Sequence, residues 1–218
     1  MTQAKKKKGV PLPYTHDMIK SHAIKSKALD VESYRGFAKL SELARISRPD
    51  EYDEVKHPEG IQRDLNKGCA RKAYDYAANP IRGEKRIWPE VILSLRDRIS
   101  DKTGIIIESC SKWKGAEEIY PVTIKIDLGK IRLDKVNPTF SRVDGNHRLH
   151  YAEGIDKKHL QLDIIVPFCI IENVSRNEEV LIFKTINETQ AKLRTDHLLR
   201  IKGQITRGID LIEKDPVL

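Results

Sequence analysis

Residues 144–148, Asp-Gly-Asn-His-Arg, combine side chains that are suited to binding an anion. Gly145 permits a positive φ or a close approach to a ligand, and it precedes a helix-compatible segment whose first N–H groups favour negative charge. Arg148 can donate two hydrogen bonds to a phosphate. Asp144 and His147 are the candidate catalytic residues, and Asp144 is also the candidate ligand for Mg²⁺. A structural Asp-Gly turn with an Asp144–Arg148 ion pair is the alternative.

The segments around this turn follow an order that resembles the DGQHR-domain family over roughly residues 61–200. The turn and the later Phe183…Ile186-Asn187…Gln190 are the strongest elements of the resemblance. The other matching segments are Gln62-Arg63-Asp64-Leu65-Asn66, Tyr74-Asp75-Tyr76 and Trp88-Pro89-Glu90-Val91-Ile92-Leu93-Ser94-Leu95. The family includes DndB-type proteins encoded with DNA phosphorothioation systems and similar proteins encoded with deazaguanine DNA-modification systems.

The resemblance implies an α/β (α+β) protein with a mixed sheet of the ParB/sulfiredoxin-like type, flanked by helices and preceded by a helical N-terminal extension. We therefore expect a basic arm and helical extension over residues 1–60 and the DGQHR domain over residues 61–218. The implied ligands are DNA and ATP or another nucleoside triphosphate, with Mg²⁺. The implied partners include other DNA-modification proteins.

Three residues of the turn region match the spacing of the phosphate-binding motif in ParB-type domains, namely Gly145, Arg148 and Ala152. By this resemblance, Gly145, Asn146 and Arg148 bind phosphate. Asn146 stands where the family usually has Gln, so its carboxamide is one methylene shorter.

Four more polar residues belong to the site through the resemblance. Gln62 and Arg63 match a family position near the start of the domain, where they would contact a nucleotide or simply cap a helix. Asn187 and Gln190 are three residues apart, which places both amides on one helix face. They would line the phosphate site or form a helix C-cap.

The turn needs a strand to deliver it, and the hydrophobic run over residues 140–143 predicts that strand. Open mixed sheets commonly bind ligands at strand ends. β-Branched runs predict further strands over residues 91–95, 105–107, 122–126 and, after a turn at Gly129-Lys130, 131–133. Residues 162–171 predict the next buried strand, which would make the intervening helix a β–α–β crossover. Ser175 and Glu178 have the spacing of a capping box that opens a helix.

Helices are predicted on both sides of this strand-rich region. Apolar residues at helical spacing over residues 31–46 predict an amphipathic helix, and a second helix is predicted from about Gln62 to Ala78. Residues 49–60 separate them as a loop rich in Pro, Asp, Glu and Gly. A further helix is expected over residues 195–212, and residues 1–13 read as a flexible basic arm.

Composition narrows the possible functions. The 218-residue chain has a net charge of +8 and a pI near 9.3, which favours an anionic partner such as nucleic acid. Its three cysteines lack the spacing of a disulfide framework or a zinc site. No apolar stretch reaches the ~20 residues that span a bilayer, so we expect a soluble, cytoplasmic protein with no membrane partner. No P-loop sequence is present, and no cysteine adjoins the turn for sulfiredoxin-like chemistry.

Three functions fit these observations. The first is a nucleotide-binding domain of a DNA-modification or defence system, with slow NTPase activity as an open question. The second is a DNA-binding transcriptional regulator that shares the fold and hydrolyses nothing. The third is a protein-interaction subunit in which residues 144–148 are structural. Binding of nucleotide or DNA phosphate is the function we favour.

Overall fold

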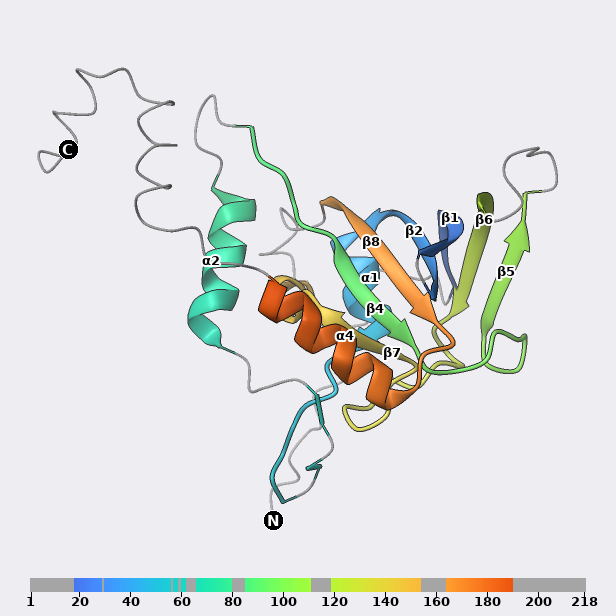
Figure 1. The fold of residues 1–218 in the computed structure, drawn as a ribbon. Coiled ribbons are helices and arrows are strands. Elements are labelled where there is room, and N and C mark those ends of the chain that lie inside the picture. The colour runs from blue at the N-terminus through green and yellow to red at the C-terminus, as the bar shows by residue number, and fades with distance from the viewer. Residues whose placement is uncertain are drawn as a thin grey trace, which may run out of the picture. The chain divides into compact units, whose positions relative to one another are not determined.

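The computed structural model describes residues 18–28, 30–55, 57–58, 60–61, 66–79, 85–110, 119–153 and 164–189. The chain divides into two compact units, residues 1–183 and residues 184–218. In the first unit, the described residues form an eight-stranded mixed sheet (Figure 1). Its strands are β1 Met18–Ala28, β2 Val31–Lys39, β3 Ser47–Arg48, β4 Val91–Leu95, β5 Ile105–Ser109, β6 Ile119–Asp127, β7 Phe140–Asp144 and β8 Ile165–Glu172. The helices are α1 Leu40–Ile46, α2 Lys67–Ala78, α3 Asn146–Leu149 and α4 Arg176–Thr189, with a 3-10 turn at His150–Ala152.

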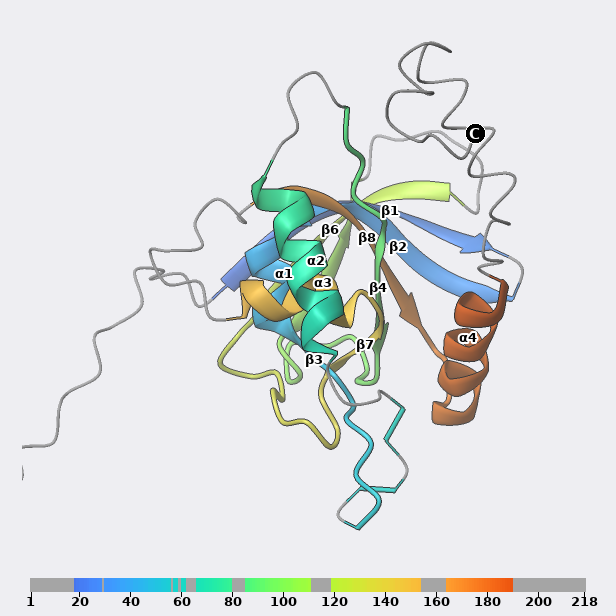
Figure 2. The same cartoon turned by 90° about the vertical axis from the view of Figure 1, so that its left-hand side faces the viewer.

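The strands lie in the order β3-β7-β4-β8-β2-β1-β6-β5. β8 pairs in parallel with β4 and antiparallel with β2, and Figure 1 shows these strands side by side. Figure 2 shows α1, α2 and α3 on one face of the sheet and the first turns of α4 near the other. The expected mixture of helices and strands around a mixed sheet is therefore confirmed.

The core forms where α1 packs against the sheet. Leu40 and Leu43 of α1 are buried in one cluster with residues from several strands, including Leu93, Ile124 and Phe168. Side chains alternate between the two faces along a strand, so these strand residues lie on the face of the sheet that α1 covers.

The amphipathic helix expected over residues 31–46 is wrong for most of its length. Residues 31–39 form β2, and only Leu40–Ile46 is helical. Within β2, Tyr34 and Ala38 are buried, whereas Phe37 is exposed. From Tyr34 to Lys39 this alternation follows the two-residue period of a strand, although Ser33 is buried as well. Pairing with β1 on one side and β8 on the other satisfies the backbone of β2, which outweighs a helical spacing of apolar residues.

The segment before residue 60 is not the helical extension that the sequence predicts. β1 and β2 lie inside the sheet, between β8 and β6, so residues 18–39 are part of the same sheet as the later strands. The basic arm over residues 1–13 lies outside the described residues. Residues 49–61, where described, contain only short bridges and turns, as the sequence predicts.

The strands predicted over residues 91–95, 105–107, 122–126, 140–143 and 162–171 are confirmed as β4, β5, β6, β7 and β8, with small differences at their ends, except that residues 162 and 163 lie outside the described residues. Residues 131–133 form no strand. The expected β–α–β crossover is wrong. β4 is antiparallel to β7 and parallel to β8, so β7 and β8 run in opposite directions, whereas a β–α–β unit needs parallel strands. The capping box is confirmed at the start of α4, where the Ser175 N–H and hydroxyl both donate to Glu178 Oε2 at 2.7 Å.

Two other helix predictions have different outcomes. The helix expected from about Gln62 is described from Lys67 to Ala78, with Asn66 as its N-cap. The helix expected over residues 195–212 lies outside the described residues. No helix in the described part of the chain combines the length and the apolar character needed to cross a membrane.

Candidate functional site

The predicted strand–turn–helix at residues 144–148 is present. β7 ends at Asp144, and Gly145 has φ 98°, in the left-handed region that favours glycine. A Cβ atom at this position would lie 3.3 Å from Nη2 of Arg148 and 3.3 Å from Cγ2 of Val91. Gly145 therefore meets two demands, a positive φ and a close approach to neighbouring side chains.

A register shift in the sheet lies directly before the turn. Ile92 of β4 pairs with Asp144, whereas its neighbour Leu93 pairs with Arg142, so that Val143 is an extra residue in β7. Such bulges bend a strand locally and change the direction of the side chains that follow. Here the bulge sets the direction of Asp144 at the point where the strand meets the turn.

Arg148 is held by two acceptors beside Gly145. Its Nη2 donates to Oδ2 of Asp144 and to the backbone oxygen of Glu90, both at 2.9 Å. Nε is buried without a partner, and Nη1 makes no hydrogen bond to the described part of the chain. The side chain keeps 19% exposure. Asp144 and Glu90 thus fix the orientation of the guanidinium, and Nη1 remains as a donor for an anion.

Asp144 has both carboxylate oxygens engaged. Oδ1 accepts the N–H of Gly145 at 2.7 Å, and Oδ2 accepts from Arg148. A Mg²⁺ ion at Asp144 would have to share or displace these donors. Among the described residues, no group of three or more His, Cys, Asp or Glu side chains is arranged to hold a metal ion. The turn's anion-binding capacity therefore rests on Arg148.

The helix after the turn is short, and some of its first N–H groups are already hydrogen-bonded. α3 has four residues, and the N–H groups of Arg148 and Leu149 both donate to the oxygen of Gly145 at 2.9 Å. The N–H of Gly145 is taken by Asp144. The N–H groups of Asn146 and His147, the first two residues of α3, make no hydrogen bond to the described part of the chain, so the expectation that they point at a ligand stays a prediction beside the Arg148 side chain.

Asn146 faces the protein interior. It is buried, and its Oδ1 accepts a hydrogen bond of 3.2 Å from Nη1 of Arg142. Arg142 is fully enclosed and also donates to Oγ and the backbone oxygen of Ser47, at 3.1 and 3.0 Å, and to Glu153. Burial lowers the pKa of the Arg142 guanidinium, and the nearby Glu153 carboxylate opposes that shift. The carboxamide oxygen of Asn146 thus supports a buried cation.

His147 connects the turn to the start of α2. Its Nε2 accepts the backbone N–H of Asn66 at 3.2 Å, so the proton of the neutral ring is on Nδ1. Burial, the Arg148 cation and His150 lower the pKa of His147, while Asp144 raises it. The net shift is downward, which keeps the imidazole neutral near pH 7. This engagement favours a positioning role over proton transfer through Nε2.

The remaining predicted site residues are placed as follows. Gln62, Arg63 and Gln190 lie outside the described residues. Asn187 is exposed in the part of α4 that belongs to the unit of residues 184–218. The structure thus brings together Asp144, Gly145, Arg148 and His147, and it turns Asn146 inward.

A second polar cluster, which the sequence did not reveal, joins the loop after β3 to the end of β4 and the start of α4. Asp50 is fully buried, and its Oδ1 lies 2.7 Å from Nε2 of His57. Its Oδ2 accepts from Nη2 of Arg96 at 2.7 Å and from Nη2 of Arg176 at 2.8 Å. Arg96 also pairs with Glu179, at 2.9 and 3.0 Å.

The charges of this cluster compensate one another. Burial opposes the charge of Arg96, but Glu179 and Asp50 raise the pKa of its guanidinium above the usual value. A buried ion pair requires such compensation, because each isolated charge would carry a large desolvation cost. The cluster is best explained as a structural tie between three segments far apart in the sequence.

The chain was compared with protein-family models, curated proteins and solved structures, and none of them matches it. The function is therefore inferred from the geometry of the turn, from the net charge of the chain and from the resemblance noted in its sequence.

Proposed function

We propose that this protein binds the phosphate groups of a nucleotide or of DNA at the turn of residues 144–148. The observation that carries the proposal is the state of Arg148. Asp144 and the backbone of Glu90 orient its guanidinium, and Nη1 is left without a protein partner in the described residues. A pre-oriented guanidinium loses little freedom on binding, which favours affinity for a phosphate.

Binding without hydrolysis is the form of the proposal that the geometry supports best. The carboxylate of Asp144 is occupied at both oxygens, and Nε2 of His147 is occupied by Asn66. Nε2 of His147 cannot accept a proton from water without first losing Asn66, and the Asp144 carboxylate would have to bind water beside its two present donors. A slow NTPase activity is therefore the second form of the proposal, and it requires the turn to rearrange when ligand binds.

The biological setting of the proposal comes from the resemblance to the DGQHR-domain family. In that setting the protein serves a DNA-modification or defence system and works beside other proteins of that system. The net charge of +8 supports a nucleic-acid partner. A DNA-binding regulator or an interaction subunit are the alternatives if no nucleotide binds.

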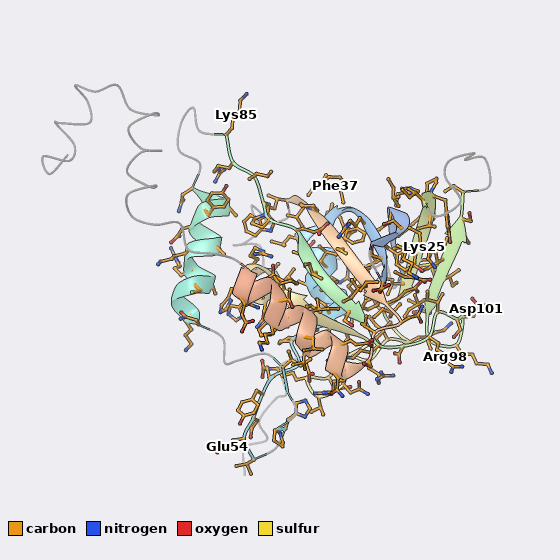
Figure 3. All side chains as sticks on the ribbon, viewed as in Figure 1. Lys25, Phe37, Glu54, Lys85, Arg98 and Asp101 are labelled. Carbon is orange, nitrogen blue, oxygen red and sulfur yellow. The ribbon has the colours of Figure 1, made fainter. Side chains whose placement is uncertain are left out.

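The test is isothermal titration of the full chain with ATP, CTP and GTP, each with and without Mg²⁺, and with a short duplex DNA. Phosphate release measured on the same samples separates binding from hydrolysis. We expect binding of at least one of these ligands. Arg98→Ala is the matched control, because Arg98 is exposed beyond the other end of β4 (Figure 3). Absence of binding to every ligand would contradict the proposal.

A further inference from the structure

One part of the sheet carries exposed apolar and basic side chains together on the face opposite to α1. Phe37 of β2 is 69% exposed, Ile165 of β8 is 71% exposed and Ile24 of β1 is 50% exposed. Lys20, Arg35 and Lys39 are exposed on the same strands. These six residues are called the open sheet face. Figure 3 shows Phe37 projecting outward from the sheet.

The register of the strands places these residues on one face. Lys39 is the cross-strand partner of Ile165, and Arg35 is the partner of Ile24. Phe37 lies between Arg35 and Lys39 in β2, and residues two apart in a strand point to the same side. Lys20 and Ile24 share a side of β1 for the same reason. Their neighbours Ile19 and Ala23 are buried on the other face.

Contiguous exposed apolar side chains on a folded protein commonly mark a binding surface. The charges indicate the kind of partner. All three charged residues of the open sheet face are cations, and the adjoining acid Glu90 is paired with Arg35, with 3.6 Å between Oε1 and Nε. A symmetric contact with a second copy would place these cations near each other, which is unfavourable. A partner with both apolar planes and negative charges fits better.

We propose that the open sheet face binds single-stranded nucleic acid. Phe37 stacks on one base, Ile24 and Ile165 contact the neighbouring bases, and the lysines of the face neutralise phosphates, while Arg35 would have to exchange Glu90 for a phosphate to do the same. A duplex fits less well, because its base faces are stacked inside the helix and are not available to Phe37. This surface lies on β1, β2 and β8, none of which supplies a residue of the turn at 144–148. The inference therefore stands independently of the proposed phosphate site.

Fluorescence anisotropy with a labelled oligothymidylate of about 15 nucleotides, a length in the range of known single-strand sites, tests the proposal on the full chain. We expect tighter binding to this strand than to a duplex of the same length. Phe37→Ala should weaken single-strand binding by about 5- to 150-fold, the range that corresponds to loss of one base-stacking contact. Phe37→Trp should retain it. Val55→Ala, which truncates an 88% exposed apolar residue elsewhere, should bind as the wild type does.

The cations are tested by salt dependence. The logarithm of the affinity should fall linearly with the logarithm of salt concentration, by about 0.7 per phosphate neutralised on a single strand. Lys20→Ala should make that slope shallower, whereas Lys102→Ala, an exposed lysine in the turn before β5, should not. A slope that is the same in both variants would count against the assignment of Lys20.

Three results would overturn the proposal. The first is a Phe37→Ala variant that binds the single strand as tightly as the wild type. The second is a concentration-dependent dimer, seen by light scattering, that Phe37→Asp converts to a monomer, because the face would then be occupied by a second copy. The third is loss of single-strand binding in Arg148→Ala but not in Phe37→Ala, which would move the nucleic acid to the turn. Thermal unfolding of each variant confirms that the fold is retained.

Discussion

Oδ1 of Asn146 accepts a hydrogen bond of 3.2 Å from Nη1 of Arg142, a buried arginine of β7. The middle residue of the Asp-Gly-Asn-His-Arg turn therefore contacts the interior, while Arg148 reaches the surface. The residues of the turn therefore differ in role. Asn146 and Arg142 anchor it to the protein, and Arg148, held by Asp144, is the group left to meet a ligand.

Asn146→Leu is expected to lower the free energy of unfolding by about 1–3 kcal/mol, because it removes one acceptor from the buried Arg142 guanidinium. Asn146→Asp keeps an oxygen at this position and should be less destabilising. Urea denaturation of both variants measures the difference. If Asn146→Leu is as stable as the wild type but loses ligand binding, the carboxamide acts on the ligand side instead.

Gly145→Ala is expected to cost about 1–3 kcal/mol of stability, the range for a strained backbone conformation at a non-glycine residue. The added Cβ also crowds Nη2 of Arg148 and the Val91 side chain at 3.3 Å. Gly145→Asn should be milder, because asparagine tolerates a positive φ better than alanine does. The melting temperatures of the two variants provide the comparison, and equal melting temperatures would show that crowding, not φ, limits this position.

The lowered pKa of His147 predicts a pH effect on stability with a definite sign. Burial depresses the folded-state pKa below the ordinary value of 6.5, so the unfolded chain binds a proton first as pH falls. Stability linked to His147 is therefore complete above pH 6.5 and declines as pH falls toward the folded-state pKa. NMR titration should give a His147 midpoint below 6.5. His147→Gln should reduce the dependence of the unfolding free energy on pH below 6.5, and an unchanged dependence would contradict this prediction.

Asp50→Ala is expected to destabilise the protein by about 3–5 kcal/mol, because it leaves Arg96 and Arg176 without their shared buried carboxylate. Chemical denaturation measures this change. Glu51→Ala is the matched control, since the adjacent Glu51 forms an exposed pair with Lys135, and such pairs contribute about 0–1 kcal/mol. Similar losses in the two variants would show that the Asp50 cluster is not the structural tie described above.

The sequence predicted the local features of the site well. The hydrophobic run into Asp144 and the need for Gly145 at a turn are both encoded within a few residues, and so is the Ser175–Glu178 capping box. The β2 strand was missed for a physical reason. Phe37 is an apolar residue on an exposed face, so the apolar spacing of this segment resembles that of a helix. The burial alternates with a period of two only from Tyr34 to Lys39.

The contacts that hold the site in place could not be predicted in the same way. Arg142 donates a hydrogen bond to Ser47, 95 residues earlier, and Asp50 accepts one from Arg176, 126 residues later. The only local signal was an arginine inside the hydrophobic run of β7, which burial makes costly unless it is paired. Partners this distant are determined by the strand order, which the local patterns along the chain do not encode.

Titration of Arg148→Ala with the tightest-binding nucleotide or DNA is the decisive measurement of whether Arg148 binds the anionic ligand. We expect a loss of about 1.5–3 kcal/mol in binding free energy, the range for a charge-assisted hydrogen bond, with the cooperative unfolding transition retained. Arg98→Ala should bind as the wild type does. A folded Arg148→Ala variant with unchanged affinity would contradict this binding role and leave the Asp144–Arg148 pair as a structural feature of the turn.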